Sequence, residues 1–425
     1  MSNTKSKIIV IGGGPAGMMS AIRASEVGCE VLLIEKNEKL GKKLYITGKG
    51  RCNLTNNCTE EDFFKNVARG EKFLKSAIYS FSPEDTISFF EENGLKLKTE
   101  RGGRVFPESD KSSDVLSALI KKLKELNVLI SLNETVKHIK LSENGEIGAI
   151  ITDKATYSDF SAVILATGGL SYPLTGSTGD GFKFAKTLGH TVTVLSPSLV
   201  PFVFSAVKNA KNEWINPDKL SYPEGLSLKN VTAKVSGEGF SHNEFGEMLF
   251  TANGASGPIV LTLSSKTALQ NILNTTFSID LKPALTWEEC DKRVLKDFSE
   301  NINKQFKNSL CDLLPKSLIG FIIELSGIPS EKPINLISRA ERAGLTELLK
   351  NLSFKIKGTE GFNHAIITAG GISLNEINPK TMQSKLVPNL YFAGEILNTD
   401  AYTGGYNMQI AFASGFLAGN YLTQK

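Results

Sequence analysis

Three glycines near the amino terminus have the spacing of a turn that binds phosphate groups. Gly12, Gly14 and Gly17 follow an apolar run over residues 7–11 and open a helical stretch that Gly28 ends. Glycines at these positions allow a tight strand-to-helix turn, close approach of a pyrophosphate to the backbone, and close packing of helix on strand. The amino terminus of the helix adds N–H donors and a partial positive charge. The motif therefore predicts a site for the phosphates of a nucleotide.

One acidic residue follows this motif at the position that suits a ribose. Glu35 comes directly after the next apolar run, residues 30–34. A carboxylate there can accept hydrogen bonds from both hydroxyls of an adenosine ribose and would repel a 2′-phosphate. Strand, turn, helix, strand and acid together predict a complete dinucleotide-binding βαβ unit. The alternative is a glycine-rich turn in an unrelated α/β protein.

A second glycine-rich cluster lies near the carboxyl terminus. The apolar run 390–393 ends in Gly394-Glu395, and Gly404-Gly405 precedes a helix of small and apolar residues. A helix that begins at Gly405 directs its positive end at whatever lies before it, which would stabilise the anionic edge that a flavin gains on reduction. Because an NAD-binding domain is usually continuous, two distant clusters favour FAD. The alternative is a glycine-capped helix that is tightly packed for structural reasons.

The segment 38–58 is rich in Gly, Lys and Asn and is expected to be an ordered loop. It carries cations, amides and hydroxyls directly after Glu35, where the phosphates and ring of a cofactor would pass. Its composition alone is more typical of a solvated loop. Cys52, within this segment, is more typical of a small packing residue than of a nucleophile.

The elements that must position these motifs fit an α/β fold of the Rossmann type. We expect a capped helix between Ser82 and Gly94, a second helix over 112–126, and a hairpin around Asn144-Gly145. The amino-acid composition changes near residue 192, where a Pro- and Ser-rich stretch precedes segments expected to form short strands and then helices. We therefore expect a discontinuous FAD-binding domain, with bounds 1–191 and 357–425. The inserted domain is expected over 192–356, β-rich over about 192–284 and helical over about 285–350.

Composition excludes several classes of protein. The 425 residues carry a net charge of +4 and no run of five or six Lys or Arg, so binding of nucleic acid is not favoured. Five scattered cysteines and four histidines show no spacing of metal ligands or of a disulfide framework, which makes a reducing cytoplasm the expected location. No apolar stretch approaches the length that spans a bilayer. We expect a small-molecule substrate, no metal and no membrane contact, and predict no particular oligomeric state.

Five stretches carry long signatures: 12–17, 41–56, 168–181, 246–258 and 368–419. They include the runs Thr-Gly-x-Gly-Arg-Cys-Asn, Thr-Gly-Ser-Thr-Gly-Asp-Gly and Tyr-Thr-Gly-Gly-Tyr-Asn. In these stretches the chain resembles the aminoacetone-oxidase-type family of bacterial FAD-binding enzymes, which also includes a reductase of dehydro-bile acids. The resemblance covers nearly the whole chain. It implies an FAD domain of the glutathione-reductase type, with a β-rich and a helical subdomain inserted between its halves.

The resemblance also implies which positions hold FAD. Residues 12–17 would bind the pyrophosphate, residues 42–53 would follow the ribityl chain and ring edge, and Val136 would contact adenine through its backbone. Gly394-Glu395 would hold the ribityl–phosphate region, and Asn407 and Met408 the pyrimidine side of the ring. The expected cofactor-binding residues are Gly12, Gly14, Pro15, Ala16, Gly17, Glu35, Lys36, Lys42, Thr47, Gly48, Arg51, Cys52, Asn53, Val136, Thr167, Gly168, Gly394, Glu395, Gly405, Asn407 and Met408.

The chain departs from the family pattern at two places where substrate could enter. Ala252-Asn253 stands where many relatives have a His followed by an aromatic residue, and Asn398 stands where an Asp is usual. The identity of the substrate is therefore the property that the resemblance predicts least well.

Flavin chemistry on an unsaturated acceptor needs a hydride donor and a general acid. Tyr172, Tyr402 and Tyr406 are the candidates for the acid, because they stand in glycine-rich segments expected to face the ring. Each is alternatively a packing or cofactor-lining aromatic. No second Gly-x-Gly-x-x-Gly follows a strand in the middle of the chain, so NADH or NADPH is expected to dock transiently.

Four functions remain open from the sequence. The favoured one is an NAD(P)H-dependent reductase of a small unsaturated molecule of steroid-like or ring type, which an apolar pocket and the 24 Phe residues suit. The alternative is an amine oxidase of the aminoacetone type that produces hydrogen peroxide. A flavin-dependent tRNA-modifying or nucleic-acid-binding protein is a third hypothesis, which rests on similarity of fold alone. A non-catalytic flavin sensor is the fourth, and every electron donor would reduce it slowly.

Overall fold

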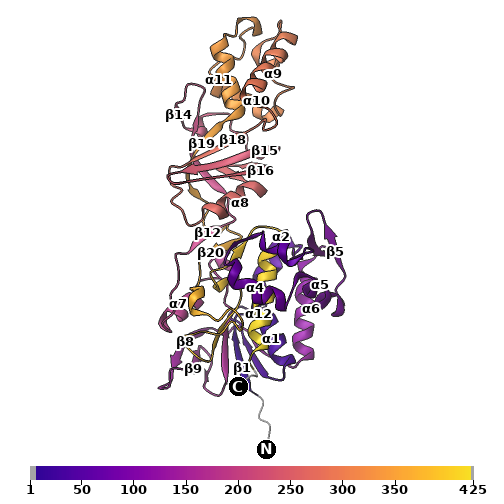
Figure 1. Cartoon of the computed structure of the whole chain (residues 1–425), viewed down its shortest axis with the longest axis vertical. Coiled ribbons are helices and arrows are strands. Elements are labelled where there is room, and N and C mark those ends of the chain that lie inside the picture. Colours follow the sequence, from indigo (N-terminus) through magenta and orange to yellow (C-terminus); the bar gives the residue numbers. More distant parts are fainter. Residues whose placement is uncertain (1–5, 423–425) are drawn as a thin grey trace, which may run out of the picture. The chain divides into compact units, whose positions relative to one another are not determined.

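The computed structural model describes residues 6–422, which form two compact units (Figure 1). Unit 1 comprises the described residues up to Ser198 and from Ala365 onward, and unit 2 comprises Leu199–His364. The inserted domain expected at 192–356 thus begins seven and ends eight residues before unit 2 does. The difference arises because strand β12 (Ser196–Ser198) pairs with strand β20 (Ile367–Ala369) inside unit 1.

Unit 1 is built on a sheet of five parallel strands in the order β21-β11-β1-β2-β7. Both faces of a parallel sheet are covered, so its strands are apolar throughout. Accordingly, four of the five residues of β1 are buried. The strands are β1 (Lys7–Ile11), β2 (Glu30–Ile34), β7 (Leu129–Ser131), β11 (Ala162–Leu165) and β21 (Leu390–Phe392).

Helices and small sheets complete unit 1. The hairpin expected around Asn144-Gly145 is present, since β8 (Val136–Leu141) pairs with β9 (Ile147–Thr152), and β10 (Thr156–Tyr157) joins them. The small strands β3 (Thr55–Asn56), β5 (Leu97–Glu100) and β6 (Arg104–Pro107) form one further sheet, and β4 (Val67–Arg69) pairs with β22 (Asp400–Ala401). The helices are α1 (Pro15–Glu26), α2 (Lys42–Gly50), α3 (Glu60–Phe64), α4 (Glu71–Ser80), α5 (Pro83–Glu92), α6 (Ser112–Glu125), α7 (Asp180–Thr187) and α12 (Tyr406–Asn420).

Helix α5 was predicted from the sequence, whereas helix α2 was not. Ser82 caps α5 as expected: its side chain accepts from Asp85 N–H while the Asp85 side chain accepts from Ser82 N–H. The segment 38–58, expected to be an ordered loop, instead contains α2 and β3. This expectation was wrong because the glycines and lysines of α2 give no apolar helical periodicity, and only Leu44 within the helix is fully buried.

Unit 2 contains a closed barrel of six antiparallel strands in the order β13-β17-β16-β15-β18-β19, with β19 pairing back onto β13. Phenylalanines fill its interior, for example Phe204 and Phe354, whose rings stack at 4.6 Å. The strands are β13 (Phe202–Lys208), β14 (Trp214–Ile215, flanking β13), β15 (Ser227–Gly237), β16 (Phe240–Thr251), β17 (Gly254–Ser256), β18 (Thr276–Asp280) and β19 (Leu352–Thr359). The helices are α8 (Pro258–Thr267), α9 (Trp287–Glu300), α10 (Lys316–Ser326) and α11 (Arg339–Lys350).

Two features are absent from residues 6–422. None of the helices in that range combines the length and apolar character needed to cross a membrane. Within the same range, no group of three or more His, Cys, Asp or Glu side chains could hold a metal ion.

Candidate cofactor site

The first glycine-rich turn joins β1 to α1 at the carboxyl edge of the parallel sheet. A Cβ on Gly12, whose φ is +108°, would lie 2.5 Å from the Ala166 carbonyl oxygen, and one on Gly17 would lie 1.9 Å from the Gly12 oxygen. Packing therefore requires glycine at both positions. A Cβ on Gly14 would meet no heavy atom within 4 Å. Gly14 thus faces open space directly in front of the helix that Pro15 begins.

Glu35 lies beside this turn and is 8% exposed. Its Oε2 accepts from Gly13 N–H at 2.6 Å, and its Oε1 accepts from the backbone and side-chain N–H groups of Asn37. Lys36, the next residue, donates to Asp180 Oδ2 at 2.8 Å, so its ammonium links β2 to the start of α7. The acid expected at a ribose is thus at the turn, whereas the lysine is engaged with a protein carboxylate.

Helix α12 packs in parallel on α1 (Figure 1). A Cβ on Gly415 would lie 2.4 Å from the Ala16 oxygen, and one on Gly419 would lie 2.6 Å from the Ser20 oxygen, so both helices run in the same direction. Gly405, which caps α12, stands ten residues before Gly415, and Gly14 stands two before Ala16. Measured along the helix direction, the positive end of α12 therefore lies about 12 Å beyond that of α1, on a neighbouring axis.

Side-chain amides hold the first turn of α12. Asn407 accepts from Ala401 N–H at 2.8 Å and donates to the Ala401 carbonyl at 2.6 Å. Gln409 is fully buried, accepts from the hydroxyls of Thr55 and Thr86, and donates to the Phe81 carbonyl. Of the two residues expected at the pyrimidine side of a flavin, Asn407 thus has its side-chain amide engaged with Ala401, while Met408 is half-buried beside it.

The segment that follows α2 has an unusual backbone. Thr47 is extended, and Gly48, Lys49 and Cys52 have φ near +58°. Cys52 is fully buried, and burial raises the pKa of its thiol to about 12, which fits packing rather than nucleophilic chemistry. The Oδ1 of Asn53 is buried without a hydrogen-bond partner among residues 6–422. Asn53 therefore has an acceptor to offer a bound group.

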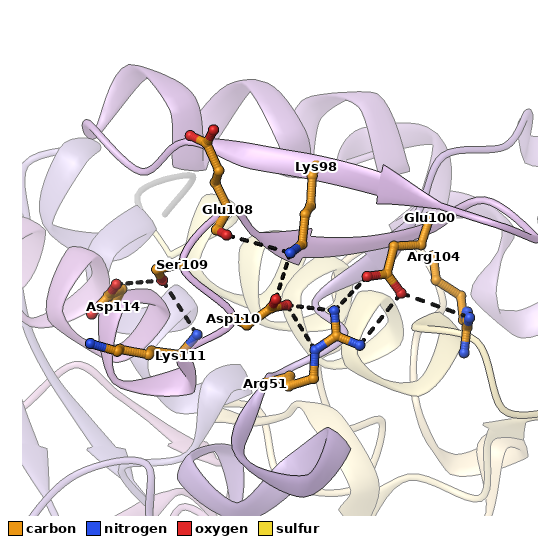
Figure 2. A network of polar contacts seen from close by, with 9 residues as sticks. All are labelled: Arg51, Lys98, Glu100, Arg104, Glu108, Ser109, Asp110, Lys111 and Asp114. Carbon is orange, nitrogen blue, oxygen red and sulfur yellow. Dashed lines mark hydrogen bonds and ion pairs between the residues drawn. The ribbon is translucent and has the colours of Figure 1, made fainter.

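Arg51 was expected at the cofactor, but its guanidinium lies in a network of charges on the β5–β6 hairpin (Figure 2). It binds Glu100 and Asp110 and lies 4.2 Å from the centre of the Phe106 ring. Lys98 joins the network at 2.6 Å from Asp110, and the two cations lower the pKa of the Asp110 carboxyl. Arg51 thus anchors the turn at Cys52 to the hairpin. Lys42 is likewise engaged, 3.0 Å from Glu38.

Two further expected positions lie at strand ends. Val136 begins β8 beside Thr152 and is buried, so its contact to a ligand would have to be through the backbone, as expected. Thr167 and Gly168 follow β11, with φ of +75° at Gly168. The Oγ1 of Thr167 is buried without a hydrogen-bond partner among residues 6–422.

A polar cluster joins four segments of unit 1, and the sequence predicted one of its members, Glu395, as a site residue but not Ser171, Thr368 or Lys43. The Lys43 ammonium donates to Ser171 and to Glu395 Oε2, the latter at 2.5 Å. Glu395 Oε1 accepts from the Ser171 hydroxyl at 2.6 Å and from Thr368 N–H at 3.0 Å. No local pattern in the sequence marks Lys43 as a member of this cluster, because its partners lie 128 and 352 positions away.

The three candidate tyrosines have different surroundings. Tyr406 is 8% exposed, packs its ring edge-on against Phe63 at 5.5 Å, and has a pKa raised to about 12 by burial. This placement favours a packing role. Tyr402 is half-buried and its N–H bonds to Asn66. Tyr172 is half-buried and its backbone is left-handed, with φ of +51°.

Buried polar atoms without hydrogen-bond partners indicate whether the site suits FAD. Four buried side-chain oxygens of unit 1 lack a partner among residues 6–422, and all lie on segments expected to line the cofactor or substrate: Asn53 Oδ1, Thr167 Oγ1, Asn398 Oδ1 and Thr399 Oγ1. Buried polar atoms are normally paired, so these fit a polar ligand. Together with the open space at Gly14 and the two helix ends, they fit FAD, which when bound supplies a ring that accepts and passes on hydride.

The comparison with protein families decides the assignment. Residues 6–421 match the model described as HI0933-like protein Rossmann domain. The chain belongs to this family. It is an FAD-dependent oxidoreductase, and the predicted family and fold class are confirmed.

Members of the HI0933-like family with curated names include three similar proteins. The chain is 31% identical to the 3-dehydro-bile acid delta(4,6)-reductase of Clostridium scindens, over 99% of both chains. It is 30% identical to the ribosomal RNA dihydrouridine synthase of Escherichia coli, over 96% of both chains. The synthase of Haemophilus influenzae is 31% identical, over 97% of both chains. None of these three relatives is an amine oxidase, and the oxidase hypothesis receives no support from them.

Solved structures show the same fold at low identity. The 3-ketosteroid-delta4-(5alpha)-dehydrogenase of Rhodococcus jostii, in complex with 4-androstene-3,17-dione, superposes with a TM-score of 0.54 at 13% identity, over 100% of this chain and 98% of that one. The 3-ketosteroid delta1-dehydrogenase of Sterolibacterium denitrificans gives 0.51 at 13% identity, over 99% of both chains.

Proposed function

We propose that this HI0933-like protein is an NAD(P)H-dependent reductase of a carbon–carbon double bond in a small ring-type molecule. The names of its relatives support this reaction class, since a delta(4,6)-reductase and a dihydrouridine synthase both hydrogenate a ring double bond. The reaction adds hydride to one carbon and a proton to the other, while NAD(P)H becomes NAD(P)+. It therefore needs a proton donor beside the ring.

The observation that carries the proposal is the placement of Tyr172. Its segment is joined through Ser171 to Glu395, one of the residues expected to hold FAD. Its side chain is half-buried, and its phenol makes no hydrogen bond within residues 6–422. A phenol in that position can donate its proton to a substrate carbon and recover it from solvent. Tyr402 is the second candidate donor, and the buried Tyr406 is the least suited.

Transient docking of NADH or NADPH is part of the proposal. All the strand pairings of the unit 2 barrel are antiparallel, so the part of this unit that the structure describes holds no second parallel βαβ unit. The nicotinamide would then share the face of the site that the substrate uses. We also propose a reducing cytoplasm as its location, which few and scattered cysteines suit.

A uridine in RNA is a second candidate substrate. The two dihydrouridine synthases are as similar to this chain as the bile acid reductase is. A uracil ring, like an unsaturated ketone, carries a double bond next to a carbonyl, so the same hydride and proton transfers apply. The net charge of +4 over 425 residues gives no strong attraction for an RNA backbone.

An anaerobic titration tests the proposal. The FAD-loaded protein is mixed with NADH and then NADPH, and bleaching of the visible flavin band is followed. Three acceptors are then added separately: 2-cyclohexen-1-one, a 3-oxo-4,6-diene steroid, and an unmodified ribosomal RNA fragment assayed for dihydrouridine by mass spectrometry. Rapid bleaching followed by turnover of either small acceptor supports the proposal. Turnover of the RNA alone moves the assignment to the second candidate, and a band that neither nucleotide bleaches contradicts both.

A further inference from the structure

The backbone of Tyr172 is held in a conformation that an aromatic residue rarely adopts. Its φ of +51° and ψ of +61° lie in the left-handed region, which is strained for a bulky side chain and persists only where the surroundings enforce it. Anchors lie on both sides. On the carboxyl side, the Tyr172 carbonyl accepts from both the N–H and the hydroxyl of Thr175, at 2.9 and 2.7 Å.

On the amino side, the anchors come from residues distant in sequence. The N–H groups of Leu170 and Ser171 both bond to the Thr368 hydroxyl, at 2.8 and 3.2 Å. The Ser171 hydroxyl bonds to Glu395 and receives a hydrogen bond from Lys43. The cluster of Lys43, Ser171, Thr368 and Glu395 therefore fixes the residue that immediately precedes Tyr172.

Lys43 is the cation on which this cluster depends. It is the one partner that neutralises Glu395 among the ion pairs of residues 6–422, and the side chains of the two residues are only 21% and 13% exposed. Without the ammonium, the carboxylate would keep its two bonds to Ser171 and Thr368 but would carry an uncompensated charge in a poorly solvated place. Water entering to solvate it would compete for the Ser171 hydroxyl.

We propose that Lys43 is a positioning residue for Tyr172: through Ser171 and Glu395 it holds the left-handed backbone that presents the phenol as proton donor. This inference rests on the proposed function for the role of the phenol, but the fixing of the backbone can be measured independently. Lys43 acts through Ser171 and does not itself transfer the proton.

The test compares Lys43→Met, Ser171→Ala, Tyr172→Phe and the double variant Lys43→Met/Tyr172→Phe, all purified with FAD. Lys121→Met is the matched control, because Lys121 lies on the surface of α6 and pairs only loosely with Glu125, at 3.7 Å. The readout independent of activity is chymotryptic cleavage after Leu174, which is 94% exposed two residues beyond Tyr172. The second readout is kcat and KM with 2-cyclohexen-1-one as acceptor, measured against pH.

We expect Lys43→Met and Ser171→Ala to keep FAD and to be cleaved after Leu174 faster than the parent and Lys121→Met, because the segment opens more often. We expect kcat of Lys43→Met to fall about 100-fold with little change in KM, as loss of a general acid would cause. The double variant should be no slower than Tyr172→Phe, since both changes remove one function.

Three results would overturn the inference. One is unchanged cleavage after Leu174 in both Lys43→Met and Ser171→Ala. A second is a double variant whose loss is the product of the two single losses. A third is loss of FAD from Lys43→Met while Ser171→Ala keeps both FAD and its protection. If the parent protein itself turns over no acceptor, the proposed function fails, and the cleavage experiment still decides whether Lys43 fixes the segment.

Discussion

Gly415 of α12 packs directly on the carbonyl of Ala16 in α1, where a Cβ would lie 2.4 Å from the oxygen. Gly415→Val should therefore force the two helices apart. Overpacking of this kind costs about 1–3 kcal/mol, and it should also displace the amino terminus of α12 and weaken FAD binding. The measurement is urea unfolding followed by circular dichroism, with FAD content determined on the same samples. Gly320→Val, at an exposed position of α10 where a Cβ would meet only Ser221 at 3.7 Å, is the matched control and should lose neither stability nor FAD.

Gly14→Ala separates cofactor binding from folding. The φ of Gly14 is −78°, which any residue adopts, and its Cβ would meet no protein atom within 4 Å. We expect an unchanged unfolding midpoint for the FAD-free protein, together with an FAD dissociation constant at least about tenfold higher, because the methyl group occupies the approach to the helix end. Fluorescence titration of FAD measures this. Equal FAD affinity in parent and variant would show that the pyrophosphate does not bind at this turn.

Gln409→Leu should destabilise unit 1. The change leaves the hydroxyls of Thr55 and Thr86 and the Phe81 carbonyl without their buried partner. Each unsatisfied group costs about 1–3 kcal/mol, so a loss of about 2–4 kcal/mol is expected after partial relaxation. Urea unfolding measures it, and Gln270→Leu on the surface of unit 2 serves as control. A variant as stable as the parent would mean that the network contributes nothing net.

His190 should make the stability of unit 1 depend on pH. Burial lowers the pKa of His190, and this effect exceeds the opposing one of Glu376, which lies 3.1 Å away. The unfolded chain therefore binds the proton more readily, so the free energy of unfolding should fall as the pH drops below about 6.5 and level off below the folded-state pKa. Measured between pH 7.5 and 5, His190→Gln should lack this slope relative to the parent, whereas His138→Gln on the exposed side of β8 should retain it. Parallel curves for the parent and His190→Gln would refute the assignment.

Local sequence patterns predicted the elements whose stabilising contacts are local. The Gly12–Gly17 turn and the Ser82 cap of α5 each depend on residues within a few positions of one another, so the sequence predicted them directly. The helix α2 escaped prediction because its backbone is interrupted at Thr47–Lys49, and only Leu44 within it is fully buried.

Contacts between distant residues could not be read from the sequence. Lys43 binds Ser171 and Glu395, which lie 128 and 352 positions away in the sequence, and no local pattern predicts such a pairing. Arg51 was expected at the cofactor from its motif, but its partners Glu100 and Asp110 lie on and just after a hairpin that the sequence did not reveal. The barrel strands were expected in part, but its closure depends on β13 pairing with β19, about 150 positions away, for example Phe204 with Ile356.

The chain leaves unit 1 and returns to it at one point, because Ser198 and Ile367 are register partners in the β12–β20 pair. On the side of unit 2, Glu360 N–H bonds to the Pro201 carbonyl, so entry and exit are neighbours there as well. A segment whose ends already meet adds little loop-closure entropy to the host fold. The insertion of unit 2 therefore places little constraint on the register of the β12–β20 pair, and the fold of unit 1 does not depend on the length of chain between these strands.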